Sequence, residues 1–351
     1  MRLFLYIILA LLPLHVMAKS TLATANADNE QQLLKLLDSY IDKRNTYSEI
    51  KEEKIKKLKL KLRTADNNSS RLSLLNTIYH EYYTYSYDSA MVYANRGLAL
   101  AQSVNNAYYT TLNRINRAAV LSTGGFYSQS EKLLQEIDTK IIPTQLLQYY
   151  YYTTTWLYNY WESFCKDSEF KNYYHQKRYH FLKLAVEATD HNNVALHAYL
   201  SGELVFLENS LSRTVLHQYM KALNNSNINI RVHASSAYGI ARYYREMGNM
   251  QLYEKYIIEA AISDMVCPLK ENLALQELST YLYKKDSKYA DRAARYIYCS
   301  MEDAQFYNNR LRMLEISSIL PIIATANQEA LAHKERIVRG VLAVVSFLSL
   351  V

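Results

Sequence analysis

The stretch Ala237–Asp264 constrains the fold of this chain more than any other. Its apolar residues recur at spacings of three and four on either side of a break, which predicts two helices joined by a turn. Gly248 and Asn249 form the break, because both residue types tolerate the left-handed conformation that ends a helix. Tyr253 departs from the tetratricopeptide (TPR) pattern, which usually has a small residue there. One helix pair cannot bury its own apolar face, so the stretch predicts neighbouring pairs. The residues that follow the TPR order are Ile240, Ala241, Tyr244, Gly248, Ile257 and Ala260.

A marker residue near the start of each second helix extends this pattern along the chain. Ala90 and Ser130 are 40 residues apart, and Tyr253 and Ala290 are 37 apart. The central gap of 123 residues accommodates three further periods of similar length. The sequence therefore predicts an all-α, TPR-like, right-handed solenoid of about six helix pairs over residues 71–308. Helical patterns lie near the two remaining places, at Asn172–Ala188 and Ser212–Leu223.

The composition agrees with a helical array and has one anomaly, its tyrosines. The 351 residues exceed one compact core, but a stacked array can run that long. Only 7 glycines and 4 prolines argue against a β-rich protein, which would need many turns. The 34 tyrosines far outnumber the 8 phenylalanines and 2 tryptophans. We interpret them as the aromatic positions of helix pairs, with the hydroxyl at the solvent edge; the alternative is a tyrosine-lined binding surface.

The N-terminal segment indicates export. Residues 1–18 have a basic start at Arg2, an apolar run, and small residues at the third-last and last positions, which is the order of a cleaved signal peptide. A retained anchor is the alternative, but the run is shorter than the ~20 residues that span a bilayer. Residues 19–29 are small and polar and predict a flexible leader.

Residues 30–65 predict a basic amphipathic helix. Nine Lys/Arg and four Asp/Glu lie between Asp42 and Arg63, and they contribute to a net charge of +7. A solvated helix face explains this charge better than a nucleic-acid patch, because no zinc finger or RNA-binding loop accompanies it. We therefore expect no direct nucleic-acid binding by this part of the protein.

The C-terminal segment predicts a long helix followed by an apolar run. Residues 309–336 continue the helical pattern across Pro321 as a connecting helix. Residues 337–351 are apolar apart from Arg339 and Gly340 and two serines, and we interpret them as the start of a transmembrane helix within which the chain ends. The alternative is a helix that docks on the last repeat.

No catalytic or metal-binding arrangement stands out. His175 and His180 are five residues apart, which does not place both rings on one helix face. No phosphate-binding or dinucleotide-binding loop is present. The sequence therefore predicts no enzyme, no cofactor and no metal. The three cysteines, which we expect to be free thiols although a bridge between the last two is an alternative, are Cys165, Cys267 and Cys299.

One aromatic stretch offers a candidate binding groove. In residues 149–161 the aromatic side chains are spread over several faces of the predicted helix, so the helix must bury more than one side or expose some of them. Core packing between adjacent repeats is the interpretation we favour. The alternative is an aromatic lining on the concave face, where repeat arrays bind peptides and extended ligands. Its candidate residues, which share one helix face, are Tyr149, Tyr152, Trp156 and Tyr160.

Short segments across the chain carry a resemblance to a known family. They are Leu33–Ser39, Arg44 with Tyr47, Lys51–Ile55, Tyr87–Ala90 and Tyr93 with Ala94. With the features above, they make the chain resemble the exported, TPR-containing, single-pass membrane proteins of Bacteroidota that are classed as a domain of unknown function. The resemblance covers nearly the whole chain and rests on structural motifs.

The resemblance implies a periplasmic repeat part, one transmembrane helix and a cytoplasmic regulatory tail, and so a role in signalling or transcriptional regulation. It carries over no catalytic residues. We therefore expect an inner-membrane protein with residues 19–336 in the periplasm, which binds a protein or peptide partner as a sensor. A periplasmic scaffold without signalling output is the alternative. This chain departs from the family by ending within the apparent membrane helix.

Overall fold

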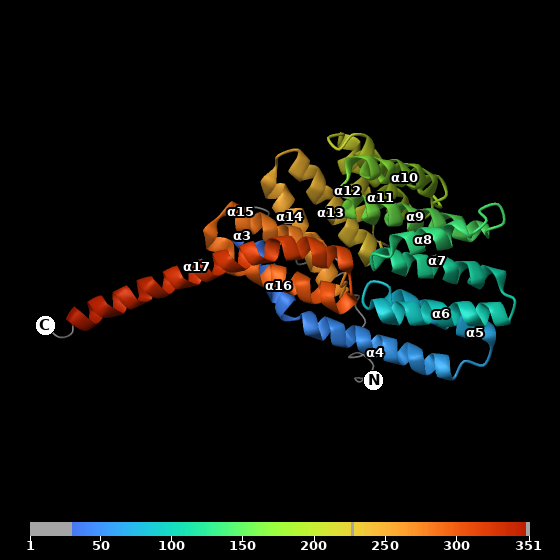
Figure 1. Ribbon diagram of the computed structural model, residues 1–351, viewed down its shortest axis with the longest axis horizontal. Helices are drawn as coiled ribbons and strands as arrows, with labels where there is room; N and C mark the ends of the chain where they lie inside the picture. Colours follow the sequence, from blue (N-terminus) through green and yellow to red (C-terminus); the bar gives the residue numbers. More distant parts are fainter. Residues whose placement is uncertain (1–29, 226–227, 272, 349–351) are drawn as a thin grey trace, which may run out of the picture.

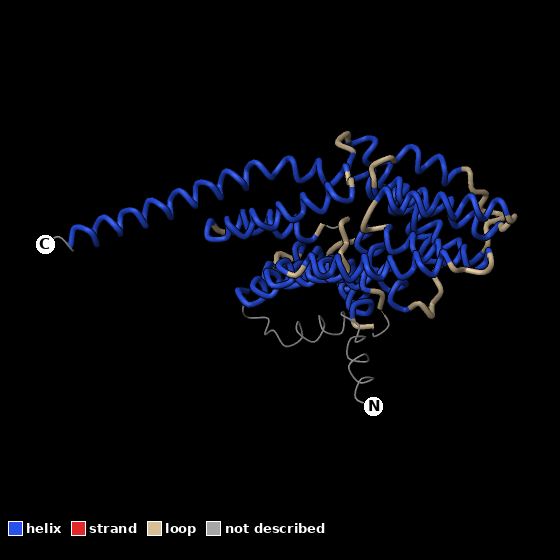
Figure 2. The backbone as a smooth tube through the Cα atoms, turned by 90° about the horizontal axis from the view of Figure 1, so that it is seen from below, coloured by secondary structure: helices blue, strands red, loops and turns tan. Residues whose placement is uncertain are grey.

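The computed structural model describes residues 30–225, 228–271 and 273–348, and every regular element within these ranges is helical (Figures 1 and 2). The predicted signal peptide and leader lie outside the described residues. The helices are α3 (Glu30–Asp42), α4 (Arg44–Arg63), α5 (Asn68–Tyr82), α6 (Tyr87–Ser103), α7 (Ala107–Thr123), α8 (Tyr127–Gln135), α9 (Thr144–Phe164), α10 (Ser168–Glu187), α11 (Val194–Glu208), α12 (Arg213–Leu223), α13 (Ile230–Glu246), α14 (Met250–Val266), α15 (Ala274–Lys285), the 3-10 helix η1 (Ser287–Tyr289), α16 (Ala290–Tyr307) and α17 (Arg310–Leu348).

Six consecutive helix pairs, from α5/α6 to α15/α16, form the predicted array. The all-α, TPR-like fold and the number of pairs are thus confirmed, while the right-handed sense stays a prediction. The four marker residues lie at or near the start of the second helices and are buried, because each is close to the neighbouring helix. The two weak central patterns correspond to α10 and α12.

The stretch on which the prediction was based folds as two helices joined by a tight turn. Gly248 has a φ of 73°, a conformation that glycine adopts without steric cost, and it ends α13. The Asn249 side chain then accepts a hydrogen bond of 3.1 Å from the backbone N–H of Leu252 and caps α14. Tyr253 is buried and packs edge-on against Tyr281 of the next pair, which explains a bulky residue at a small position.

The predicted helix over residues 30–65 is two helices that meet at Lys43. The break follows from two separate cores. The apolar face of α3 joins the core of the later repeats, whereas Ile55 of α4 joins the core of α5 and α6. In Figure 1, α3 lies beside α14 and α16 while α4 runs back toward α5. The N-terminal segment therefore connects the last repeats with the first.

Charged side chains hold α3 in this place. The Asp38 carboxylate accepts hydrogen bonds from the hydroxyl of Tyr296 at 2.8 Å and from the Nε of Arg292 at 3.0 Å. Both partners belong to α16, more than 250 residues further along the chain. An ion pair between Arg295 and Asp42 adds a more exposed contact.

The last pair also contacts the first two pairs directly. The hydroxyl of Tyr307, at the end of α16, donates to the carbonyl oxygen of Tyr83 at 2.7 Å and lies 2.6 Å from the hydroxyl of Thr123. The backbone N–H of Lys270 donates to the carbonyl oxygen of Thr84 at 2.8 Å. Because the two ends of the array meet, its inner face encloses a space.

Several tyrosine hydroxyls are buried and hydrogen-bonded to other repeats, which corrects the expectation that they lie at the solvent edge. Tyr79 donates to the carbonyl oxygen of Asn116 at 3.1 Å, and Tyr307 donates to that of Tyr83 at 2.7 Å. A buried hydroxyl without a partner would be costly, so each of these bonds fixes the position of one repeat on another.

Helix α17 packs on the array only through its first part. Leu311, Ile316 and Ile323 are buried, after which the helix projects away from the body (Figures 1 and 2). The apolar side chains of Ile337 and Val345 are 54% and 56% exposed, so this end does not dock on the last repeat. None of the helices in the described ranges has the length and apolarity needed to cross a membrane. The transmembrane helix thus stays a prediction.

We expect Tyr307→Phe to destabilise the fold. The substitution removes the hydroxyl that joins the end of the array to its beginning and leaves a buried carbonyl oxygen without its donor. The free energy of unfolding should fall by about 1–2 kcal/mol, measured by urea denaturation.

Tyr298→Phe is the matched control, because Tyr298 belongs to the same helix and is 47% exposed. Its effect should stay within about 0.5 kcal/mol. Equal effects of the two substitutions would show that the closing contact adds no stability.

Candidate binding site

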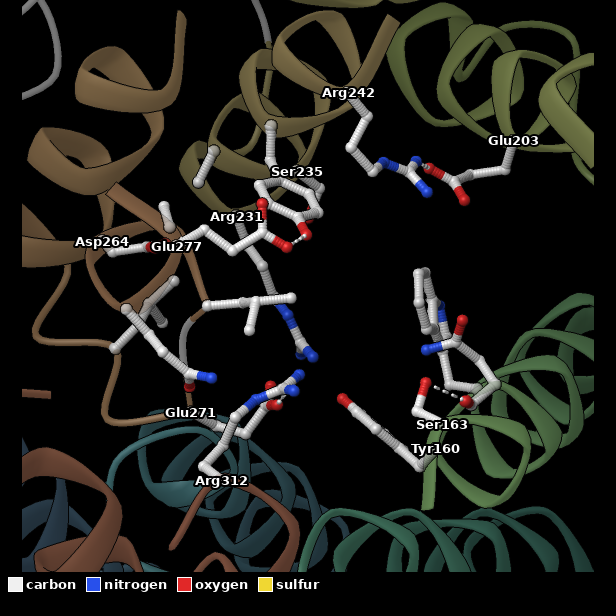
Figure 3. Close-up of a pocket in the computed structure, with 18 of the residues that line it drawn as sticks. Tyr160, Ser163, Glu203, Arg231, Ser235, Arg242, Asp264, Glu271, Glu277 and Arg312 are labelled. Carbon is white, nitrogen blue, oxygen red and sulfur yellow. Dashed lines mark hydrogen bonds and ion pairs between the residues drawn. The ribbon is translucent and has the colours of Figure 1, made fainter. Parts of the chain in front are cut away.

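A cavity of about 470 Å³ lies at the inner face of the closed array (Figure 3). Helices α9, α10, α11, α13, α14, α15 and α17 and the segment between α14 and α15 contribute its walls. Its size is in the range of small-molecule sites. The lining combines an aromatic wall with a set of arginines and carboxylates.

Helix α9 supplies much of the aromatic wall. Tyr152, Trp156 and Tyr160 follow one another at a spacing of four and all line the cavity. Trp156 stacks on Tyr199 of α11, with ring centroids 6.5 Å apart and planes 9° apart. Tyr149, the fourth predicted groove residue, is not in the lining, because its hydroxyl donates to the side chain of Asn116 at 2.9 Å. The structure thus brings three of the four predicted residues together.

Glu203 of α11 collects three donors at one end of the cavity. Its carboxylate accepts from the hydroxyl of Tyr219 at 2.7 Å and from Arg178 at 3.4 Å, and it is paired with Arg242 (Figure 3). The carboxylate is thereby fixed in place by groups from three other helices.

Two glycines hold Tyr219 against this carboxylate. A Cβ atom added at Gly202 would lie 2.8 Å from the Tyr219 ring, and one at Gly239 would lie 2.6 Å from it. Real Cβ atoms do not approach other atoms so closely, so the ring occupies space that only glycine leaves free. These glycines therefore bring the tyrosine hydroxyl to Glu203.

A second polar group lies at the other end of the cavity. Arg312 of α17 donates to Glu315 at 2.8 Å and pairs with Glu271 at 3.5 Å. Glu277 accepts from the hydroxyl of Tyr238 at 2.6 Å and from Arg245 at 2.9 Å. Each of these carboxylates has a donor within the protein.

Arg231, in the first turn of α13, is different. Its guanidinium lies over the ring of Tyr83, 4.7 Å from the centroid, and no carboxylate of the described residues forms an ion pair with it. Figure 3 shows it pointing into the cavity beside Arg312, with the hydroxyl of Tyr160 facing the same space. Cationic and hydroxyl donors thus converge on one point of the cavity.

Asp264, near the end of α14, is a buried acid in the lining of the same cavity. Burial raises its pKa well above the usual value, and the negative charges of Glu271 and Asp303 raise it further, while Arg231 lowers it by less. The side chain therefore holds its proton at acidities where an exposed aspartate has lost it. A neutral Asp264 does not neutralise Arg231.

The sequence analysis missed the charged residues of the cavity, although one signal could have found them. Glu203 and Arg242 are 39 residues apart, Tyr238 and Glu277 are 39 apart, and Glu271 and Arg312 are 41 apart. These separations equal one repeat period. Complementary residues at equivalent positions of successive repeats therefore indicate the polar contacts between them.

The site shows no arrangement suited to metal chemistry. Across the described ranges, no group of three or more His, Cys, Asp or Glu side chains is placed to hold a metal ion. All three cysteines are free thiols, which agrees with the favoured interpretation of the sequence. The arrangement offers aromatic faces and fixed hydrogen-bond donors, which suit binding.

We expect Asp264→Asn to change how stability depends on pH. The folded-state pKa of Asp264 lies above its unfolded value near 3.8, so the folded protein retains a proton that the unfolded chain releases. This contribution to stability is present at low pH and is lost as the pH rises toward the folded-state pKa. Between about pH 5 and about pH 8, the native chain should lose about 1 kcal/mol or more relative to the variant.

Urea unfolding of both proteins at the two pH values measures this difference. Asp88→Asn, at an exposed position of α6, is the control and should follow the native chain. A parallel pH dependence of Asp264→Asn and the native chain would show that Asp264 is ionised in the folded protein.

Comparison with known proteins agrees with this architecture. The family described as the SusR N-terminal TPR domain matches residues 41–318, which cover α4 to the first part of α17. No curated protein matches the chain. The match covers the helix pairs and the cavity, and the chain belongs to the SusR N-terminal TPR domain family.

Proposed function

We propose that this chain is the ligand-binding repeat domain of a SusR-like regulatory protein, and that its central cavity binds a short segment of a protein or peptide partner. The observation that carries this proposal is the cavity of about 470 Å³, in which an aromatic wall faces fixed polar groups. TPR domains commonly bind protein partners on the inner face of the array. We assign the domain a binding role and no catalytic role.

The chemistry of the lining supports a peptide segment. Tyr152, Trp156 and Tyr199 offer flat apolar surface for a side chain, while Arg231 and Glu277 offer groups that recognise polar and charged atoms. A cavity of this size takes a ligand of a few residues rather than a folded surface. The partner would therefore insert one segment.

We propose that the domain is held at the inner membrane, with residues 19–336 in the periplasm. The apolar run in residues 1–18 supports export, and the exposed apolar end of α17 supports insertion of that end into the membrane. A sensor would pass the ligand-bound state along α17, which starts at the cavity with Arg312 and leaves the body. A scaffold without signalling output would bind the partner without this step.

We expect Trp156→Leu to weaken peptide binding. A hexapeptide library is screened against the full chain by thermal shift, and the hits are titrated by isothermal calorimetry. Loss of the aromatic face in the cavity should reduce the affinity of the hits by about ten-fold or more.

Trp161→Leu is the matched control, because Trp161 belongs to the same helix but stacks on Tyr174 and Tyr127 outside the cavity. It should leave the affinities unchanged. The absence of any binding peptide, or an equal loss in both variants, would contradict a peptide site in this cavity.

We expect alkaline phosphatase fused after Arg336 to be active in bacterial cells, because this enzyme folds only after export. The same fusion without residues 1–18 should be inactive. Comparable inactivity of both fusions, at equal expression, would contradict the proposed periplasmic location.

A further inference from the structure

The arginines of the cavity are not equivalent in their ion pairs. Arg178 pairs with Glu162 and Glu203, Arg242 pairs with Glu203, and Arg312 pairs with Glu271 and Glu315. Arg231 alone among the four cavity arginines has no carboxylate within ion-pair distance in the part of the chain that the structure describes. A guanidinium with an open side, turned into a cavity, is a site for an anion.

The position of Arg231 in its helix adds to this argument. It is the second residue of α13, two positions after the N-cap Asn229, where the backbone N–H groups give the helix end a partial positive charge. Cations are disfavoured at this end of a helix and anions are favoured. The partial positive charge of this helix end therefore favours a negative group placed against Arg231.

The carboxyl group of Asp264 does not supply the anionic partner that Arg231 lacks. Because burial and neighbouring carboxylates raise the pKa of Asp264, this side chain stays protonated and contributes no full negative charge. Glu271 attracts Arg231 from beyond ion-pair distance, but it is paired with Arg312. The open side of the Arg231 guanidinium thus faces the cavity.

We propose that the cavity binds a ligand through a carboxylate, which accepts two hydrogen bonds from the guanidinium of Arg231 and one from the hydroxyl of Tyr160. This inference rests on the proposed function and deepens it by naming the group that the site recognises. The body of the ligand then lies along Tyr152 and Trp156, which line the same cavity.

The surrounding charges favour a carboxylate over a phosphate. Glu271, Glu277 and Glu315 also line the cavity, so a doubly charged anion would be repelled more strongly than a singly charged one. The fork of a guanidinium also matches the two oxygens of a planar carboxylate. A neutral ligand would leave Arg231 as it is now, without an anionic partner.

Acid and amide forms of the same compound test this directly. We would titrate the full chain with 3-phenylpropionate and 3-phenylpropionamide, and with the tripeptide Gly-Gly-Phe as the free acid and as the amide. Fluorescence of the Trp161→Phe variant, in which Trp156 is the remaining tryptophan, reports binding at the cavity. The dissociation constant of each acid should be lower than that of its amide by a factor of about ten or more.

Further probes identify the source of the carboxylate. Preference for Gly-Gly-Phe acid over the small acid points to the C-terminus of a peptide. Preference for an amidated tripeptide that contains Glu points to an acidic side chain, and preference for 3-phenylpropionate points to a small organic acid. Tighter binding of phenyl phosphate than of all three would overturn the choice of a carboxylate.

The variant Arg231→Gln should abolish the difference between acid and amide. Arg213→Gln is the matched control, because it removes the same charge from an exposed position at the start of α12. It should retain the preference for the acid. Loss of the preference in both variants, or in neither, would overturn the proposal.

A stability measurement separates a ligand-binding arginine from a structural one. Arg242→Gln breaks the pair with Glu203 and should lower the melting temperature of the ligand-free chain. Arg231→Gln breaks no ion pair and loses only the contact with the Tyr83 ring, so it should lower the melting temperature clearly less than Arg242→Gln does. An equal decrease in both variants would show that Arg231 is a structural cation.

The outcomes distinguish this inference from the proposed function. In one outcome, library peptides bind equally well as acids and as amides and still lose affinity in Trp156→Leu. This result would support the peptide site and contradict recognition of a carboxylate. The absence of any acid-dependent response to the probes would overturn the carboxylate whether or not library peptides bind.

Discussion

The closing contact at Tyr307 determines what the other elements of this array can do. A row of helix pairs whose ends stay apart exposes its inner face along the whole length. Here the hydroxyl of Tyr307 reaches the carbonyl oxygen of Tyr83 and the hydroxyl of Thr123, while α3 packs on α14 and is hydrogen-bonded to α16 through Asp38. These contacts join residues more than 180 positions apart. The inner face thereby becomes a wall around a cavity, and residues of seven helices can contact one ligand.

The carboxylates that line this closed cavity are held in place by hydrogen-bond donors of the protein itself. Glu203 receives Tyr219, Arg178 and Arg242, and similar contacts hold Glu277 and Glu315. Because Arg178, Arg242 and Tyr238 belong to repeats next to those of their acceptors, the hydrogen bonds that satisfy the buried groups also fix the spacing between repeats. Binding and stability therefore depend on one set of side chains. A ligand that altered one of these contacts would change how two repeats pack.

The sequence predicted the helix pairs well because their signals are local. Gly248 with Asn249 marks a turn by its own backbone preference, and the period between Ala90 and Ser130 is visible without any tertiary information. The break at Lys43 was missed because it depends on which core each half of the segment joins, and that is decided by distant helices. The role of Arg231 was missed for a similar reason: an open guanidinium is recognised only when all neighbouring carboxylates have been placed.

The docking of α3 has a consequence for the order in which the protein can fold. This helix is made early, but its apolar face packs on α14, and its Asp38 bonds to Arg292 and Tyr296 of α16. Until those helices have emerged, Leu34 and Leu37 have no native surface to cover them. A segment near the start of the chain therefore completes its packing last, and the loop that closes is nearly as long as the array itself. Such a long closure slows folding and leaves one early apolar helix in need of protection during synthesis.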